Sequence, residues 1–460
     1  MMNLKTGHRK KYFMLVSIII TLAVFLVACG GKSSPVDVES GQETTIEEDK
    51  AEAEPEECDP VVLNYWDEFG GPADAAVWDP IFEEFNATHE CIQVEVRHIA
   101  DDNFFTAIRT GVTSANPPDV FMHESGLMLK ELVEAGAVMD ITDWWEENED
   151  RWQPGTNEGN IIDGVVYAVP FESFLRDIIA WNEDILEEYN IEPPQTFDDL
   201  LEACDVLSEA GEIPLAIGNQ RGWPGGHIWQ TMALRIAGAE KQNKLINREG
   251  VHWTDPDFIL ASERYLELKQ RNCLSPGFAS DDFGTGEAIF LGGNAAFYHP
   301  LTLTMPTWPE DLNYDWGRWP MMPDDQQPYA DKWDLFLVNI YGFSISSKTE
   351  HPDEALVLFE YLVSPEVQKK FVNNERITPM VGILEEDKIS NDLARWQEII
   401  EQGTGTIGFV VLEIPAEVSR QIFDVGASAV WTEQMTPREW MEAMEIGHAE
   451  LTNTEPVLNP

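Results

Sequence analysis

The residues best suited to contact a ligand follow two short apolar runs. Trp66-Asp67-Glu68 stands at the end of the run that begins at residue 61, and His123-Glu124-Ser125 follows the run 119–122. An indole presents a flat apolar face, and carboxylates accept hydrogen bonds. Ligands of doubly wound sheets bind beyond the carboxyl ends of the strands, which favours both groups as binding residues. Core packing of Trp66 and plain solvation of Asp67 are the alternatives.

Motifs for covalent catalysis or metal binding are missing from the sequence. It contains no GxSxG, no P-loop and no CxxC, and its nine histidines form neither HxxxH nor HExxH. We therefore expect no metal and no cofactor. A glycoside hydrolase would need two carboxylates across a cleft, but 83 acidic residues make such a pair uninformative.

The charge balance excludes some partners. The 460 residues include 83 acidic and 29 basic side chains, for a net charge of −54, and 43% of the residues are hydrophobic. Nucleic-acid binding requires clustered Lys and Arg to neutralise phosphates, so this class of function is excluded. The apolar content is enough for two hydrophobic cores.

The N-terminus has the pattern of an export signal. Basic residues precede an apolar run over 12–28, which ends at Leu26-Val27-Ala28-Cys29-Gly30. This ending resembles a bacterial lipobox, so we predict that residues 1–28 are a signal peptide and that Cys29 is lipidated. The alternative is a single N-terminal membrane anchor. Residues 29–59 are acidic and lack aromatic side chains, which predicts a disordered tether.

Four further cysteines remain in an exported chain, which suggests two disulfides. Cys58 and Cys91 each precede an apolar run. If these runs are neighbouring parallel strands, the two cysteines lie at the same end of the sheet. We therefore favour Cys58–Cys91 and, by elimination, Cys204–Cys273. Buried free thiols are the alternative.

From residue 60, short apolar runs alternate with segments of helical periodicity. We expect strands over 61–66, 92–96 and 119–122, with helices around 78–85, 104–108 and 127–135. This order predicts a doubly wound, mostly parallel α/β sheet. Later helices have recognisable starts at Thr196, Ser364 and Thr436, and Gly211 is expected to end the first of these three.

An ordered set of local patterns resembles the solute-binding proteins of bacterial carbohydrate ABC importers, the group that includes maltodextrin-binding proteins. The resemblance covers residues 61 to about 450. It rests on Tyr65-Trp66, Ile81-Phe82-Glu83-Glu84-Phe85-Asn86, Asn116-Pro117-Pro118-Asp119-Val120-Phe121, Asp163-Gly164-Val165-Val166-Tyr167-Ala168-Val169-Pro170, Trp181-Asn182-Glu183-Asp184, Pro193-Pro194-Gln195-Thr196-Phe197-Asp198-Asp199-Leu200, Gly293-Asn294-Ala295-Ala296-Phe297 and Gly342-Phe343-Ser344-Ile345-Ser346.

The resemblance implies a fold of two lobes. Each would be a doubly wound α/β lobe, and a hinge would join them, as in type II periplasmic-binding-protein-like folds. The crossovers would lie near Pro170, Trp319-Pro320 and Thr378-Pro379. One lobe would then hold residues 60–169 and 321–378, and the other 170–320 and 379–460.

The implied site is a cleft in which aromatic side chains stack on sugar rings and polar side chains bind hydroxyls. Trp223 lies in the glycine-rich stretch 219–226, which we interpret as a loop too rich in glycine to be core. One or two of Trp308, Trp316, Trp319 and Trp333 could also face the cleft. The candidates, each with a structural role as the alternative, are Trp66, Asp67, Glu124, Glu172, Trp223, Tyr298, His299 and Tyr341.

The resemblance implies an extracytoplasmic, lipid-anchored solute-binding component of an ABC importer. It would bind a di- or oligosaccharide, deliver it to the membrane permease subunits and act as a monomer without catalysing a reaction. Two alternatives remain: the same fold binding a non-sugar solute, and a secreted carbohydrate-active enzyme.

Overall fold

The structure is a computed structural model that describes residues 58–69, 72–99, 101–153, 156–322, 335–383, 390, 392–396 and 405–458. Its folded unit begins at Cys58 and runs to Pro460. The predicted signal peptide, Cys29, nearly all of the predicted tether, and Trp333 lie outside the described residues.

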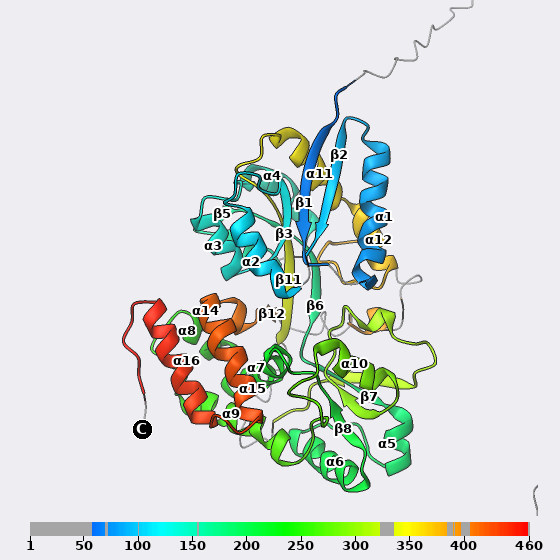
Figure 1. Cartoon of the computed structure of the whole chain (residues 1–460), viewed down its shortest axis with the longest axis vertical. Helices are drawn as coiled ribbons and strands as arrows, with labels where there is room; N and C mark the ends of the chain where they lie inside the picture. The colour runs from blue at the N-terminus through cyan, green and yellow to red at the C-terminus, as the bar shows by residue number, and fades with distance from the viewer. Residues whose placement is uncertain are drawn as a thin grey trace, which may run out of the picture. The chain divides into compact units, whose positions relative to one another are not determined.

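The first sheet has the strand order β12-β11-β3-β1-β2, and β6 also pairs with β11 (Figure 1). Its strands are β1 (Val61–Asp67), β2 (Ile92–His98), β3 (Val120–Glu124), β6 (Val169–Leu175), β11 (Leu335–Ile345) and β12 (Gly405–Ile407). β1 runs parallel to β2 and β3, as the sequence predicts, whereas β11 is antiparallel to β3 and β6. Strands β6 and β11 therefore add to this sheet segments that lie well beyond β1, β2 and β3 in the sequence.

The second sheet has the order β10-β7-β9-β8, and its only parallel pair among the described strands is β8 with β9. Its strands are β7 (Ile178–Asn182), β8 (Ile213–Ala216), β9 (Ala295–Tyr298) and β10 (Tyr314–Arg318). A separate two-stranded hairpin consists of β4 (Ile161–Ile162) and β5 (Val165–Val166).

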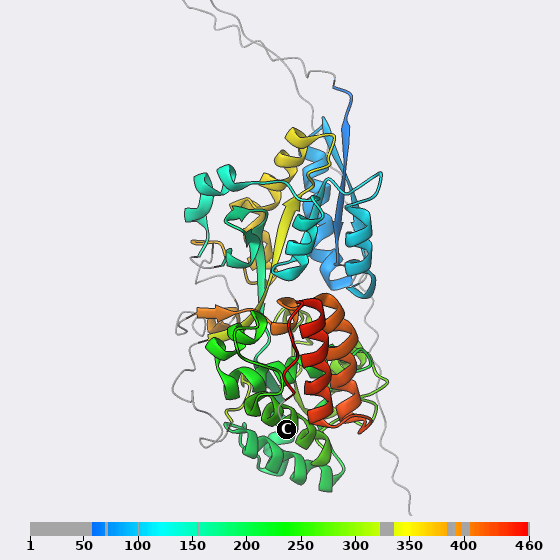
Figure 2. The ribbon, with the colours of Figure 1, turned by 90° about the vertical axis from the view of Figure 1, so that its left-hand side faces the viewer.

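Helices surround both sheets, and α15 and α16 lie side by side (Figure 2, orange and red). Those around the first sheet are α1 (Pro72–Thr88), α2 (Asp101–Gly111), α3 (Leu127–Glu134), α4 (Thr142–Asn148), α11 (Pro352–Leu362) and α12 (Pro365–Asn373). The others are α5 (Glu183–Tyr189), α6 (Phe197–Ala210), α7 (Trp223–Ala237), α8 (Ala239–Ile246), α9 (Pro256–Gln270), α10 (Phe283–Leu291), α14 (Ala416–Val418), α15 (Asp424–Trp431) and α16 (Pro437–Leu451).

The helix boundaries follow from local chemistry. Thr196 and Thr436 each form a capping box, in which the threonine and the third helical residue bond each other's backbone N–H. Ser364 accepts a hydrogen bond from the backbone of Val367 and caps α12. Gly211 ends α6 at φ 88°, a left-handed conformation that glycine adopts without strain. All four sequence predictions of helix ends are confirmed.

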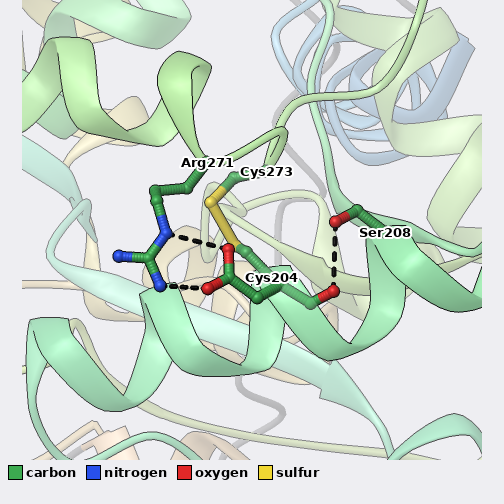
Figure 3. Close-up of a disulfide and its surroundings, with 5 residues drawn as sticks. Cys204, Ser208, Arg271 and Cys273 are labelled. Atoms are coloured by element: carbon green, nitrogen blue, oxygen red, sulfur yellow. Dashed lines mark hydrogen bonds and ion pairs between the residues drawn. A yellow bond between two sulfur atoms is a disulfide. The ribbon is translucent and has the colours of Figure 1, made fainter.

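Both predicted disulfides are present. Cys58–Cys91 joins the start of β1 to the turn before β2, where the backbone N–H of Val61 also bonds to the Cys91 carbonyl. Cys204 of α6 bonds to Cys273, which follows α9 (Figure 3). Beside this second bridge, the guanidinium of Arg271 forms an ion pair with the carboxylate of Asp205, with Nε 2.8 Å from Oδ1.

Candidate functional site

A cavity of about 240 Å³ lies next to the carboxyl ends of β1 and β3. Strands of the first sheet line it together with the helices α7 and α10, which lie beside the second sheet. On the side of the first sheet the lining residues are Glu68, Phe69, Asp74, Glu124 and Tyr341. On the opposite side they are Trp223, His227, Phe283, Leu301, Leu303 and Thr304. The remaining wall consists of Arg176, Phe409, Val411, Leu412, Arg420 and Asp424.

Trp223 lines this cavity next to two other aromatic rings. Its half-buried ring lies 4.9 Å from His227 and 5.1 Å from Phe283, measured between ring centroids. Together these rings form an aromatic wall, which here means Trp223, His227 and Phe283. The structure thus brings one of the predicted stacking residues to the cavity.

The interpretation of the stretch 219–226 as a loop holds for 219–222 but is wrong from Trp223 on, because Trp223 is the first residue of the buried helix α7. Its glycines permit close packing. A Cβ at Gly222 would lie 1.8 Å from the carbonyl oxygen of Asp424, and one at Gly225 would lie 2.3 Å from the hydroxyl of Tyr265. The glycines therefore mark contact between segments distant in sequence, which a single sequence does not distinguish from loop flexibility.

Arg176 places a cation against the aromatic wall. It lies between β6 and β7, and its Nη1 is 3.0 Å from Nδ1 of His227. Burial, followed by the nearby Arg176 charge, lowers the pKa of His227 well below its usual value, so the neutral ring accepts this hydrogen bond. The guanidinium carbon is 5.6 Å from the Trp223 ring and 5.5 Å from the Phe409 ring. These contacts hold a strong hydrogen-bond donor beside an apolar surface.

Tyr341 and two carboxylates form the facing side. Tyr341 of β11 is the register partner of Glu124 on β3, so the two residues are cross-strand neighbours. Burial raises the pKa of Tyr341 well above its usual value, and the charges of Glu68 and Glu124 raise it further. The neutral phenol donates a hydrogen bond to Glu68. Both Tyr341 and Glu124 were predicted as site residues and both line the cavity.

Glu172 supports the cavity from behind. It is also a register partner of Tyr341, but its side chain is buried and is not among the lining residues. Its Oε1 is 2.9 Å from Nη1 of Arg376, whose Nη2 is 2.6 Å from the Asp74 carboxylate. Arg376 thereby joins β6 to Asp74, which does line the cavity. The position favours an indirect role for Glu172 in placing the wall.

Trp66 and Asp67 lie apart from the cavity. The Trp66 ring packs beneath the guanidinium of Arg97, 4.4 Å away, and against α2, where Gly111 leaves room for it. Asp67 is buried and bonds to Nδ1 of His98 at 2.7 Å. Because β1 continues to Asp67, the first side chain to reach the cavity is the next one, Glu68.

Tyr298 and His299 are buried in packing positions outside the cavity lining. The Tyr298 ring contacts Phe290 and Trp308 at centroid distances of 5.6 and 6.1 Å. His299 lies 5.3 Å from the Trp319 ring, and burial lowers its pKa to about 3, so it is neutral. The described tryptophans of the predicted tryptophan-rich stretch are all buried in the core: Trp308, Trp316 and Trp319.

Several lining residues were not predicted from the sequence. Arg176 had a usable signal, because it lies with Asp177 between two apolar segments in a chain with few basic residues. Arg420 had none. It lies in the π-helical segment Ser419–Phe423, a conformation common at functional sites but not visible in a single sequence.

Metal binding and membrane insertion find no support in the described part of the chain. Within it, no group of three or more His, Cys, Asp and Glu side chains is arranged to hold a metal ion. Likewise, none of its helices is both long and apolar enough to span a bilayer.

Comparisons with known proteins agree with this architecture. A sequence model described as bacterial extracellular solute-binding protein matches residues 70–369. An uncharacterised ABC transporter extracellular-binding protein of Pyrococcus horikoshii is 23% identical over 79% of this chain and 78% of its own length. The alpha-glucosides-binding periplasmic protein of Rhizobium meliloti is 22% identical over 60% of this chain and 63% of its own.

A solved structure shares the fold. It comes from work on xylan utilization by the thermophilic bacterium Caldanaerobius polysaccharolyticus and superposes with a TM-score of 0.77. The match covers 84% of this chain and all of that one, at 19% identity. The two-lobed, type II periplasmic-binding-protein-like architecture expected from the sequence is confirmed.

Proposed function

This chain belongs to the family of bacterial extracellular solute-binding proteins, and from that membership we propose that its solute is a di- or oligosaccharide. One observation carries the proposal. The cavity sets the aromatic wall at Trp223 opposite Tyr341, Glu68 and Glu124. Sugars present an apolar ring face and a rim of hydroxyls, and this combination of surfaces matches both.

The polar groups of the cavity can both accept hydrogen bonds from sugar hydroxyls and donate hydrogen bonds to them. Glu124 and Asp424 offer carboxylate oxygens as acceptors, while Arg176 and Arg420 offer N–H donors. Charge-assisted hydrogen bonds are stronger than neutral ones, and a closed cavity sheds the water that would compete for them. A relative that binds alpha-glucosides supports the sugar class. A non-sugar solute or a secreted enzyme has no comparable support, and we propose that this chain catalyses no reaction.

We keep the division into two lobes as a proposal, with residues 60–169 and 321–378 in one and 170–320 and 379–460 in the other. Glu124 and Tyr341 fall in the first lobe, and Trp223 and Arg420 in the second. A sugar that touches all four stabilises the state in which the lobes are close together. That state would be the form presented to the permease subunits of an ABC importer by a monomeric binding protein.

Family membership implies an extracytoplasmic location, and we propose a lipid anchor for it. Residues 1–28 would be removed as a signal peptide, Cys29 would carry the lipid, and residues 29–59 would serve as a tether. Intact-mass analysis of the membrane-extracted protein should show cleavage before Cys29 and added acyl mass, and Cys29→Ala should be released from membranes. A membrane-bound wild type that retains residues 1–28 would instead indicate an uncleaved anchor.

A thermal-shift screen with mono- and oligosaccharides tests the solute class. A ligand that binds only the folded state raises the melting temperature. At a free ligand concentration of a hundred times the dissociation constant, it adds about 2.7 kcal/mol to the free energy of unfolding. A shift with a sugar series, and none with peptides or polyamines, supports the proposal. A screen in which only non-sugar solutes stabilise the protein, or in which a bound sugar is hydrolysed, would reject it.

Calorimetry on two tryptophan variants tests the site. Trp223→Ala should weaken binding of the best sugar roughly 5- to 150-fold, the loss of about 1–3 kcal/mol. Trp66→Ala is the matched control, because Trp66 is also half-buried beside an arginine but lies outside the cavity. Unchanged affinity in Trp223→Ala, or an equal loss in both variants, would place the sugar elsewhere.

A further inference from the structure

Glu413 places a carboxyl group on the boundary between the two proposed lobes. It follows the 3-10 turn Val410–Leu412, whose residues Val410 and Val411 belong to the hydrophobic core around the second sheet. Its carboxyl group lies against Gly126, the residue before α3 on the side of the first sheet. A Cβ built on Gly126 would lie 2.7 Å from Oε1 of Glu413 and 3.1 Å from Oε2. One lobe therefore supplies the acid, and the other supplies part of the surface that covers it.

The half-buried carboxyl group of Glu413 has no polar partner in the described part of the chain. No described residue donates a hydrogen bond to it or forms an ion pair with it. The backbone N–H of Gly126 donates to the carbonyl of Gly159 instead. On the other side lies Gly408, where a Cβ would be 3.2 Å from Oε1, and the Gly408 carbonyl accepts a hydrogen bond from Gln242. Two glycine backbones thus enclose an acid whose charge no described neighbour compensates.

Charged side chains lie on the elements around Glu413, but burial alone raises the pKa of Glu413, to about 7 from an ordinary 4.5. Helix α8 faces the turn with Gln242, while its lysines form ion pairs within α8 and with acids at the start of α9. The other charged groups near this boundary are Glu124, Arg109, Glu131 and Glu158 on the side of the first sheet, and Glu417 and Arg420 on the opposite side. None of them contributes to the shift of the Glu413 pKa.

This arrangement links the contact between the lobes to a proton. When the lobes separate, water reaches the carboxyl group and its pKa returns toward the ordinary value. Because the pKa is raised in the contact state, the contact is fully favoured only below about pH 4.5, and this advantage is lost as the pH rises through about 7. A solute that draws the lobes together at neutral pH must also drive the uptake of a proton by Glu413.

We propose that Glu413 is a proton-linked switch of lobe closure, in which the neutral acid lets the turn at residues 410–412 rest against Gly126 and the carboxylate disfavours this contact. The inference uses the proposed two lobes and goes beyond the proposed solute class. A solute that binds the closed state has an apparent affinity that scales with the population of that state. Solute affinity is therefore highest in mildly acidic surroundings and falls as the pH becomes alkaline.

Calorimetry with the best sugar of the thermal-shift screen tests the switch. The wild type should bind roughly 10- to 30-fold more weakly at pH 8 than at pH 5.5, and at pH 6 it should take up about one proton per sugar bound. Titrations in buffers of different ionisation enthalpy measure this uptake. Glu413→Gln keeps the shape of the side chain but cannot ionise, so its affinity should change less than about threefold and its proton uptake should fall by about one. Glu417→Gln removes an exposed acid nearby and is the matched control, which should behave as the wild type does.

Loss of both effects in Glu413→Gln alone supports the switch. An equal pH dependence of affinity in the wild type and Glu413→Gln overturns it, and so does the same loss in Glu417→Gln. If no sugar binds, the proposed function fails, and small-angle scattering of the free protein decides the switch separately. The radius of gyration should then increase between pH 5.5 and pH 8 in the wild type and stay constant in Glu413→Gln. The same response of both proteins would overturn the inference.

Discussion

Trp66 and Trp223 have similar side-chain surroundings and different positions relative to the cavity. Each is half-buried with a guanidinium near its ring, but Arg97 and α2 enclose Trp66, whereas Trp223 faces the cavity. The difference arises from strand geometry. Trp66 lies within β1 and packs against α2, whereas the cavity lies beyond the carboxyl end of the strand. Glu68 reaches it because β1 ends one residue later than Trp66.

At the same scale, His98 should make stability depend on pH. The Asp67 carboxylate raises the pKa of His98 to about 9, from an ordinary value of 6.5. Because the folded-state pKa is raised, the charged His98 stabilises the protein fully below about pH 6.5, and this contribution is lost as the pH rises through about 9. Urea unfolding of the wild type and His98→Gln should differ by about 1–2 kcal/mol at pH 6 and by much less at pH 10. A difference that stays constant with pH would contradict this assignment.

At the scale of elements, close packing of the first turn of α7 fixes the position of Trp223. Its glycines let the helix approach Tyr265, Trp431 and Phe423 closely, and this approach positions Trp223 at the edge of the cavity. Close packing of this kind leaves no room for an added methyl group, and overpacking forces side chains or backbone to shift.

Two glycine-to-alanine substitutions compare a tightly packed glycine with one that has open space around it. Gly225→Ala should destabilise the protein by about 1–3 kcal/mol, because the new Cβ would lie 2.7 Å from the Trp431 ring as well as close to Tyr265. Gly284→Ala is the matched control in α10, where the nearest atom to a new Cβ is 4.0 Å away. There alanine should stabilise by up to about 1 kcal/mol because of its higher helix propensity. Chemical denaturation of both variants measures the contrast, and similar effects in the two would show that packing at α7 is looser than the structure implies.

On the scale of the whole molecule, the acidic excess is concentrated away from the interior. Arginines are scarce, and several are used in buried ion pairs, such as Arg248 with Glu445 and Arg376 with Glu172. Among the described residues only seven acidic side chains are buried: Asp67, Asp119, Glu124, Glu172, Asp177, Asp424 and Glu445. The other described carboxylates are exposed or half-buried, in a chain with a net charge of −54. Self-repulsion among them opposes the compact state when salt is low. A saline habitat is a hypothesis consistent with this balance.

Salt should accordingly raise the melting temperature at neutral pH. At about 0.15 M ionic strength the screening length falls to about 8 Å, which weakens repulsion between surface carboxylates. We expect the melting temperature at pH 7.5 to rise between low salt and about 0.5 M NaCl. The same titration near pH 4.2, where the net charge is close to zero, should show a much smaller rise. A melting temperature that does not change with salt at pH 7.5 would remove the reason for the habitat hypothesis.

The sequence by itself determined the features that depend on neighbouring residues. The βα order, the caps at Thr196 and Thr436 and the two disulfide pairs could all be predicted, because periodicity, capping chemistry and cysteine placement act over short distances or through strand order. Only the tertiary structure decided which side chains meet. Arg376 joins Glu172 across 204 positions, and Asp424 packs on Gly222 from another helix. Such contacts depend on register, on helix packing and on the π-helical turn at Arg420, none of which leaves a local pattern in one sequence.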